Sequence, residues 1–353
     1  MVMKTNFNQV SGCQAVVLLT AIFCISQFPM PGVAAPVKSS VEPVVIMLQP
    51  GVTGGEIQDA LNSLPESGGE VVLPPGNILV RQPLVLRRDF QSLRGSGAAT
   101  VLQLADNANC PVIILGQPVN APRVSVKYLC VSDLTIDGNR SHQSRELWQL
   151  AGEGSEIRNN GLTIQGVTDS AVKNVASAHC RSGGLVTTLG VRRLTVKNFE
   201  SFDNEFDGLA CYLTEESIFS NLNLHDNPGA GISLDLAFNH NTISNATLNA
   251  NDLGIFMRSS NQNKFYGVSI KSSRQHGVFM AQAEEFTAGG SRPAPLTECT
   301  HNAFTNLAAV DCGGVAFRVN DSTCTNNTIN RATFNGNRSG NLSLAGPDLV
   351  TLR

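Results

Sequence analysis

The sequence has few charged residues and no segment in which basic side chains gather. Only 15% of its 353 residues are charged, and 25 Lys and Arg against 28 Asp and Glu give a formal net charge of −3. This charge pattern excludes nucleic acid as a partner, because such partners are bound through positive charge. Aromatic residues are also scarce, at 6%, whereas Gly occurs 32 times. This composition favours many tight turns over long helices.

The chain also has no Pro- or Ser-rich linker, and no long apolar run follows its N-terminus. We therefore expect a single elongated domain over residues 43–353, without a membrane span. No spacing of His, Cys or Asp matches a zinc site, so we expect no metal and no cofactor. We expect the domain to be a monomer.

The first residues have the pattern of an export signal. Lys4 supplies a positive charge, residues 15–25 are apolar, and small residues follow up to Ala34. This order predicts a cleaved signal peptide over residues 1–34, followed by a short linker over 35–42. The protein would then be secreted, to the periplasm or outside the cell. An uncleaved membrane anchor is the alternative.

A short apolar strand recurs along the chain at a nearly constant interval. Each copy begins with Gly, and successive copies are 23, 24, 23, 23 and 23 residues apart: Gly161, Gly184, Gly208, Gly231, Gly254 and Gly277. Gly314 and the segment 341–344 continue the series after a longer step. This period is that of one coil of a β-solenoid, with three short strands joined by turns. The fixed Leu offsets of leucine-rich repeats are missing.

Asparagines repeat in the same phase as the glycines. They follow alternating stretches such as LTVKN and NTISN, at Asn174, Asn198, Asn221, Asn245 and Asn306. Stacked coils lie about 4.8 Å apart, so identical Asn side chains can form hydrogen bonds from coil to coil. We expect these residues to be structural.

The N-terminal part of the domain predicts a cap. Thr53 and Glu56 have capping-box spacing, and Ile57, Leu61 and Leu64 recur at helical spacing. A helix over residues 54–64 could cover the open end of the solenoid, where strand edges would otherwise be unpaired.

This helix is followed by GGEVVLPPG at residues 68–76, PLVL at 83–86 and LRGSG at 93–97. The series, ahead of stacked coils, resembles the pectate-lyase-like (pectin-lyase fold) superfamily over residues 43–353. The resemblance implies an all-β fold, a right-handed parallel β-helix. It does not imply one activity, because that superfamily includes lyases, hydrolases, epimerases, phage tailspikes and non-catalytic proteins. The family motifs RIK, DPHD and RxPxxR are absent, so no catalytic residue is carried over.

Strand alternation predicts which side chains of the glycine-led strands point outward. One predicted outward column contains Thr163, Val186, Ala210, Ser233, Phe256, Phe279 and Ala316. The other contains Gln165, Thr188, Tyr212, Asp235, Arg258, Ala281 and Arg318. In the second column a phenol, a carboxylate and a guanidinium fall on three consecutive coils, with Cα atoms about 5 Å apart. Enzymes that abstract the C5 proton of a uronate sugar need a cation, a base and an acid of this kind.

Other candidates flank this column. His240 follows the Asp235 strand, whereas Asp207 and His276 directly precede glycines three coils apart. Insertions near 139–158 and 282–298 could form walls on both sides of the face, and Trp148 of the first could stack on a sugar. Phe256 and Phe279 would form a sugar platform or be covered by the second insertion. Calcium is possible only at the aspartates of adjacent turns, Asp203, Asp207 and Asp226.

Cysteine usage adds one expectation about stability. Two of the nine cysteines lie in the export signal, and an odd number remains. Cys299 and Cys324 occupy matching positions of neighbouring coils, which predicts a disulfide between them. Cys211 should be a buried thiol.

The sequence thus favours an exported enzyme acting on acidic polysaccharide, a lyase or an epimerase. In this hypothesis Arg258 neutralises a carboxylate, Asp235 orients Arg258, and Tyr212 or His240 moves the proton. The substrate would also contact Trp148, Gln165, Asp207, His276 and Arg318. A hydrolase of the same fold that uses Asp207, Asp235 or loop carboxylates, and a non-catalytic solenoid that binds glycan or protein, are the alternatives.

Overall fold

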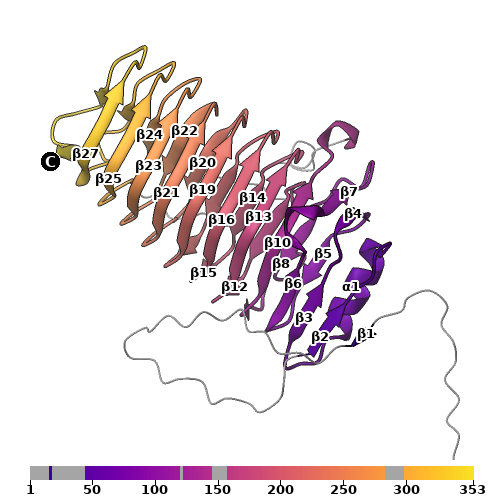
Figure 1. The fold of residues 1–353 in the computed structure, drawn as a ribbon. Helices are drawn as coiled ribbons and strands as arrows, with labels where there is room; N and C mark the ends of the chain where they lie inside the picture. The colour runs from indigo at the N-terminus through magenta and orange to yellow at the C-terminus, as the bar shows by residue number, and fades with distance from the viewer. Residues whose placement is uncertain (1–15, 18–43, 120–121, 145–156, 283–297) are drawn as a thin grey trace, which may run out of the picture.

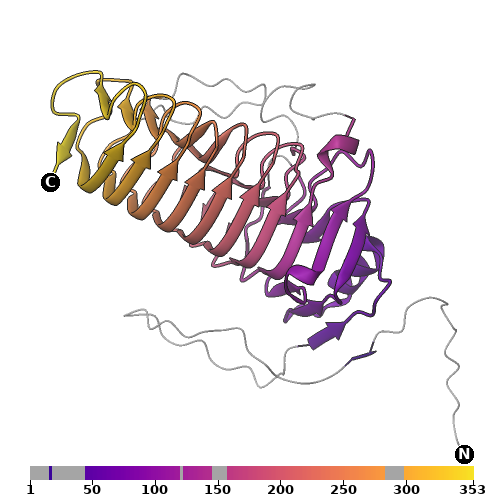
Figure 2. The same cartoon turned by 45° about the horizontal axis from the view of Figure 1, so that its top comes forward.

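The computed structural model describes residues 16–17, 44–119, 122–144, 157–282 and 298–353. The chain winds into a parallel β-helix whose coils stack from the N-terminal end, with helix α1 (Gly54–Ser63), to the C-terminal strand β29 (Val350–Leu352) (Figure 1). Figure 2, turned by 45° about the horizontal axis, shows the same regular succession of coils. The predicted fold class is confirmed. The predicted signal peptide and linker lie outside the described residues, apart from β1.

The longest sheet, sheet A, has fifteen strands. Its main path runs through β1 (Val16–Val17), β2 (Val44–Met47), β3 (Gly69–Val72), β6 (Gln91–Arg94), β10 (Cys130–Asp137), β13 (Ala171–Ala178), β16 (Thr195–Phe202), β19 (Ile218–His225), β21 (Thr242–Asn249), β23 (Lys264–Lys271), β25 (Ala303–Val310), β27 (Asn327–Asn335) and β29 (Val350–Leu352). The strands β4 (Gly76–Val80) and β7 (Thr100–Leu104) join it at one side.

Sheet B contains the glycine-led strands of the repeat. Its ten strands are β5 (Leu84–Leu86), β8 (Ile113–Leu115), β11 (Leu162–Gln165), β14 (Leu185–Thr188), β17 (Leu209–Tyr212), β20 (Ala230–Asp235), β22 (Leu253–Arg258), β24 (Val278–Ala281), β26 (Phe317–Val319) and β28 (Leu342–Leu344). Sheet C is short, with only β9 (Val126–Lys127), β12 (Val167–Thr168), β15 (Val191–Arg192) and β18 (Thr214–Glu215). A third strand is therefore formed in the middle coils rather than in every coil. Two short 3-10 turns, η1 (Gly97–Ala99) and η2 (Arg140–His142), complete the elements.

Side chains that alternate along the strands fill the inside of the coils. The core contains aliphatic residues of all three sheets together with stacked phenylalanines. The rings of Phe265 and Phe304 lie 4.3 Å apart and nearly parallel, and Phe317 meets Phe304 edge-on at 5.2 Å. Because one coil covers the next, burial of this apolar surface holds the stack together.

The predicted asparagine ladder follows the outer surface of sheet A. Nδ2 of Asn198 donates to Oδ1 of Asn174 at 2.7 Å, Asn221 donates to Asn198 at 2.9 Å, and Asn245 donates to Asn221 at 3.3 Å. Each of these residues has a left-handed backbone, which Asn tolerates better than most residues. Asn306 has the predicted register, but Gly267 occupies the coil between Asn245 and Asn306 and has no side chain to continue the ladder to it.

Further asparagine ladders are buried inside the turns. In one of them Nδ2 of Asn204 donates to Oδ1 of Asn227 at 2.9 Å, and Nδ2 of Asn227 donates to Oδ1 of Asn251 at 2.9 Å. The other contains Asn241, Asn263, Asn302 and Asn327. The same acceptor oxygens also bind backbone amides of the preceding coil, so these side chains satisfy turn groups that water cannot reach.

Helix α1 (Gly54–Ser63) lies at the N-terminal end of the stack and packs on β3, β4 and β5 (Figure 1). Its capping box is present: the amide of Glu56 donates to Oγ1 of Thr53, and the Glu56 carboxylate accepts the Thr53 amide. Ile57 and Leu61 are fully buried. The predicted cap is confirmed. In the described part of the chain, no helix has the length and apolar character needed to cross a membrane.

The cysteine predictions had opposite outcomes. Cys211 is a buried thiol, as expected, and burial raises its pKa to about 12. Cys299 and Cys324 lie next to each other, but both are free thiols, so the predicted disulfide was wrong. The amide of Cys299 donates to Sγ of Cys324 at 3.4 Å.

Candidate functional site

The outer face of sheet B brings together most of the side chains that strand alternation predicted. Tyr212 and Asp235 are paired on β17 and β20, and the column continues to Arg258 on β22. In the neighbouring column, Ser233 pairs with Phe256 and Phe256 pairs with Phe279. The register of these coils is therefore confirmed.

Asp235 and Arg258 form an ion pair in this face. Nε of Arg258 donates to Oδ2 of Asp235 at 3.0 Å, and a second guanidinium nitrogen donates to the same oxygen. Only 3% of the Asp235 side chain is exposed, against 32% for Arg258. The other carboxylate oxygen accepts the amide of Leu236 at 2.8 Å. Asp235 is thus placed to orient Arg258, whose guanidinium is the more accessible partner.

Aromatic rings continue the face toward the C-terminal coils. Phe256 and Phe279 are stacked with centroids 5.7 Å apart and an interplanar angle of 4°. The guanidinium of Arg258 lies 5.2 Å from the centre of the Phe256 ring, and that of Arg318 lies 5.6 Å from the centre of the Phe279 ring. A two-ring stack with a cation on each of its two rings can hold a sugar ring and attract acidic groups.

The predicted register was wrong at β26. Phe279 pairs with Arg318, so Arg318 continues the column of the two phenylalanines and does not follow Ala281. The cause is that Ala316, not Gly314, lies opposite Gly277. Alternation could not reveal this, because a shift of two residues keeps every side chain on its own side.

His276 lies against this aromatic stack. Its ring is nearly parallel to that of Phe279, with centroids 5.9 Å apart, and Nε2 is 3.4 Å from the Arg318 guanidinium. Nδ1 accepts the amide hydrogen of Val315 at 3.0 Å, so the neutral ring carries its proton on Nε2. Partial burial, and then the charge of Arg318, hold the pKa of His276 below the usual histidine range.

This lowered pKa leads to a pH prediction. Below pH about 6.5, the unfolded chain binds a proton at His276 more readily than the folded chain does. The free energy of unfolding should therefore rise with pH until about 6.5 and then level off, as far as this residue contributes. His276→Asn keeps an acceptor for Val315 and should flatten that part of the curve. Urea unfolding of both proteins between pH 5 and 8 measures it, and equal slopes would contradict the assignment.

Several predicted site residues lie elsewhere. His240 was expected to reach the face of Asp235, but it is exposed at the corner beyond sheet C, beside Glu216. Gln165 was expected to bind substrate, but its side chain is buried and donates to the carbonyl oxygen of Val119 at 2.7 Å. Trp148, which was predicted to stack on a sugar, lies outside the described residues, and so do most residues of the two insertions.

The aspartates at the turns contact protein groups. Asp207 stands three strands away from His276 in sheet B, as expected, and accepts the amide of Ala230 at 2.7 Å. Asp203 pairs with Arg140, and Asp226 contacts His225. Among residues 44–119, 122–144, 157–282 and 298–353, no cluster of three or more His, Cys, Asp or Glu is arranged to hold a metal ion.

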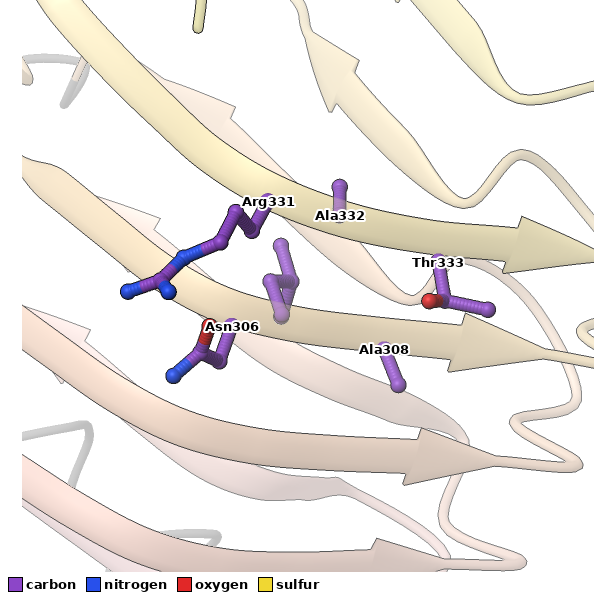
Figure 3. Close-up of a pocket in the computed structure, with 6 residues that line it drawn as sticks. Asn306, Ala308, Arg331, Ala332 and Thr333 are labelled. Atoms are coloured by element: carbon purple, nitrogen blue, oxygen red, sulfur yellow. The ribbon is translucent and has the colours of Figure 1, made fainter.

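A shallow depression lies on the opposite side of the coils, on the outer surface of β25 and β27. Figure 3 shows Arg331 beside Asn306 at one end and Thr333 at the other, and the lining is Asn306, Leu307, Ala308, Arg331, Ala332 and Thr333. Arg331 is the one charged residue of this lining. It has no acid–base pair, so the outer face of sheet B remains the candidate site.

Comparisons with known proteins agree with the fold. A family model described as "Right handed beta helix region" matches residues 214–349. The A-module of mannuronan C-5 epimerase AlgE4 from Azotobacter vinelandii is 15% identical, with a TM-score of 0.53, covering 85% of this chain and 95% of that one. No curated protein sequence matches significantly.

Two bacteriophage proteins are also similar. Gene product 12 of bacteriophage phi29, in its pre-mature form, is 15% identical, with a TM-score of 0.63, covering 83% of this chain and 40% of that one. The enzymatically active domain of tailspike protein 2 of bacteriophage CBA120 is 12% identical, with a TM-score of 0.58, covering 84% and 44%. The chain thus spans less than half of these phage proteins. At such identities the likeness concerns the fold alone, and that fold is the right-handed parallel β-helix.

Proposed function

We propose that this chain is an exported polysaccharide-active enzyme, a lyase or an epimerase that acts on uronate-containing polysaccharide at the outer face of sheet B. The observation that carries the proposal is the stack of Phe256 and Phe279 with Arg258 and Arg318 against it. Aromatic rings fit the apolar face of a sugar, and two guanidinium groups fit its carboxylates. The mannuronan C-5 epimerase named above has the same fold.

Each residue of the face has a separate part in the proposed reaction. Arg258 binds the carboxylate of the reacting sugar and stabilises the charge that develops when the C5 proton leaves. Asp235 is a positioning residue, because it is buried and fixes the guanidinium. Tyr212, on the strand next to Asp235, moves the proton.

The two proposed reactions differ in what happens once the C5 proton has left. In elimination, the C5 proton leaves, a C4–C5 double bond forms, and the bond from C4 to the glycosidic oxygen breaks, with that oxygen taking up a proton. In epimerisation, a proton returns to C5 on the opposite side. His276 and Arg318 lie against Phe279 and hold the neighbouring sugar.

The test is incubation of the purified protein with pectate, alginate and glucuronan. Lyase activity gives unsaturated products, seen by ultraviolet absorbance, and epimerase activity changes the C5 configuration, seen by NMR. New reducing ends without unsaturation would identify a hydrolase instead. Absence of both unsaturated and epimerised sugars from all three substrates would overturn the proposal.

A further inference from the structure

We propose a second carbohydrate-binding site, formed by the stacked rings of Phe90 and Tyr128 at the corner between sheets C and A. Phe90 directly precedes β6 and Tyr128 directly follows β9. The ring centroids are 4.9 Å apart with an interplanar angle of 19°. Each residue is 46% exposed. The inference goes beyond the proposed reaction and does not depend on catalysis at sheet B.

Hydrogen bonds fix the backbone that carries the two rings before any ligand arrives. The amide of Phe90 donates to the carbonyl oxygen of Lys127 at 3.1 Å, and the amide of Tyr128 donates to that of Thr168 at 3.2 Å. These bonds tie each turn to the next coil. A binding surface that is already ordered loses little conformational entropy on association.

The backbone at both positions is also unusual for aromatic residues. Phe90 has φ 62° and Tyr128 has φ 59°, in the left-handed region. This conformation costs a residue with a side chain about 1 kcal/mol or more. The equivalent turn of the preceding coil has Gly68, where a Cβ would come within 2.3 Å of Cβ of Phe90. The same turn is left-handed on the following coils too, at Asp169 and Arg193, so the backbone conformation belongs to the fold and the two aromatic rings are what distinguishes this corner.

Polar and charged groups border the rings on the coil of Tyr128 and on the two coils that follow it. The Lys127 ammonium lies 5.6 Å from the centre of the Tyr128 ring. Arg193 donates to both carboxylate oxygens of Asp169, at 2.6 and 2.8 Å, and this contact keeps the pKa of Asp169 below its usual value. The rim therefore presents charged donors and acceptors that can bind sugar hydroxyl groups.

The size and chemistry of this surface favour a glycan over a protein. A stable protein interface needs about 800 Å² from each partner, far more than two half-exposed rings provide. A sugar ring is small enough to rest on the stack, with its C–H groups against the rings and its hydroxyl groups toward Lys127 and Arg193. We therefore assign a polysaccharide chain as the occupant. Bound there, a polymer would be kept near the enzyme while another part of it lies on sheet B.

The test compares binding of soluble polysaccharides, both neutral and uronate-containing, by affinity electrophoresis and calorimetry. The variant Phe90→Gly/Tyr128→Gly removes both rings while keeping residues that accept the backbone, as Gly68 does one coil earlier. Its affinity for at least one polysaccharide should fall tenfold or more, a loss of about 1.4 kcal/mol. Tyr128→Phe with Phe90→Tyr keeps the stack and should bind like the wild type.

Tyr266→Gly is the matched control, because this tyrosine of β23 is 42% exposed on sheet A. It should leave binding unchanged, and circular dichroism checks that all variants are folded. Equal affinities of wild type and double variant for every polysaccharide would overturn the inference. So would self-association that sedimentation detects in the wild type alone, since the occupant would then be a second copy.

Discussion

Replacing Asn227 by alanine is expected to lower the free energy of unfolding by about 3 kcal/mol or more. The Asn227 side chain is fully buried, and its Oδ1 accepts both the amide and the Nδ2 of Asn204. Its Nδ2 donates to Oδ1 of Asn251 and to the carbonyl oxygen of Ser201. Alanine would leave the buried amide of Asn204 without its acceptor, which costs about 1–3 kcal/mol. It would also remove one hydrogen bond each from Nδ2 of Asn204, Oδ1 of Asn251 and the Ser201 carbonyl, and would leave a small cavity.

Asn221 of the exposed ladder provides the control. It makes two similar ladder bonds, at 2.9 and 3.3 Å, but water can replace them. Because its φ is 55°, Asn221→Gly is the compatible change and should cost less than about 1 kcal/mol. Urea unfolding followed by circular dichroism measures both variants, and hydrogen exchange shows whether the loss is centred on the coil of Asn227. Equal costs would mean that burial of the inner ladder adds nothing to stability.

The repeat explains why the fold could be predicted from the sequence. Glycines such as Gly184 and Gly208 recur because a Cβ at either position would meet backbone or side-chain oxygen atoms of the adjacent coil. Their period of about one coil is thus imposed by packing and is visible without coordinates. The inner ladder was not singled out, although Asn204, Asn227 and Asn251 have the same spacing. Period alone does not tell a buried turn from an exposed one, since both repeat once per coil.

The candidate site was predictable only where the coils are uniform. Tyr212, Asp235 and Arg258 were placed correctly, because the strands between them have constant length and alternation fixes the side. Arg318 was misplaced by two residues because the preceding coil has an insertion. Its position could have been found by counting from the end of the preceding strand of sheet A. Arg318 lies eight positions after Val310, just as Phe279 lies eight positions after Lys271. His240 was misplaced because the sequence does not show where the chain turns the corner into sheet C.

Arg258→Ala should lower kcat/KM on the uronate substrate by about 100-fold or more, because it removes a fixed cation from the point where negative charge develops. Arg258→Lys should recover part of this loss, since an ammonium keeps the charge but not the paired hydrogen bonds with Asp235. Arg94→Ala is the matched control. Arg94 also pairs with a carboxylate, that of Glu70, but it lies on sheet A.

Asp235→Asn tests the positioning role separately from the charge that contacts the substrate. The guanidinium of Arg258 would remain but would lose its ionic anchor, so kcat should fall more than KM rises. If Arg258→Ala left kcat/KM unchanged while Asp235→Asn reduced stability, the ion pair would be purely structural. Because Asp235 is buried and Arg258 is partly exposed, the two variants should affect different quantities: stability and orientation for Asp235, and transition-state binding for Arg258.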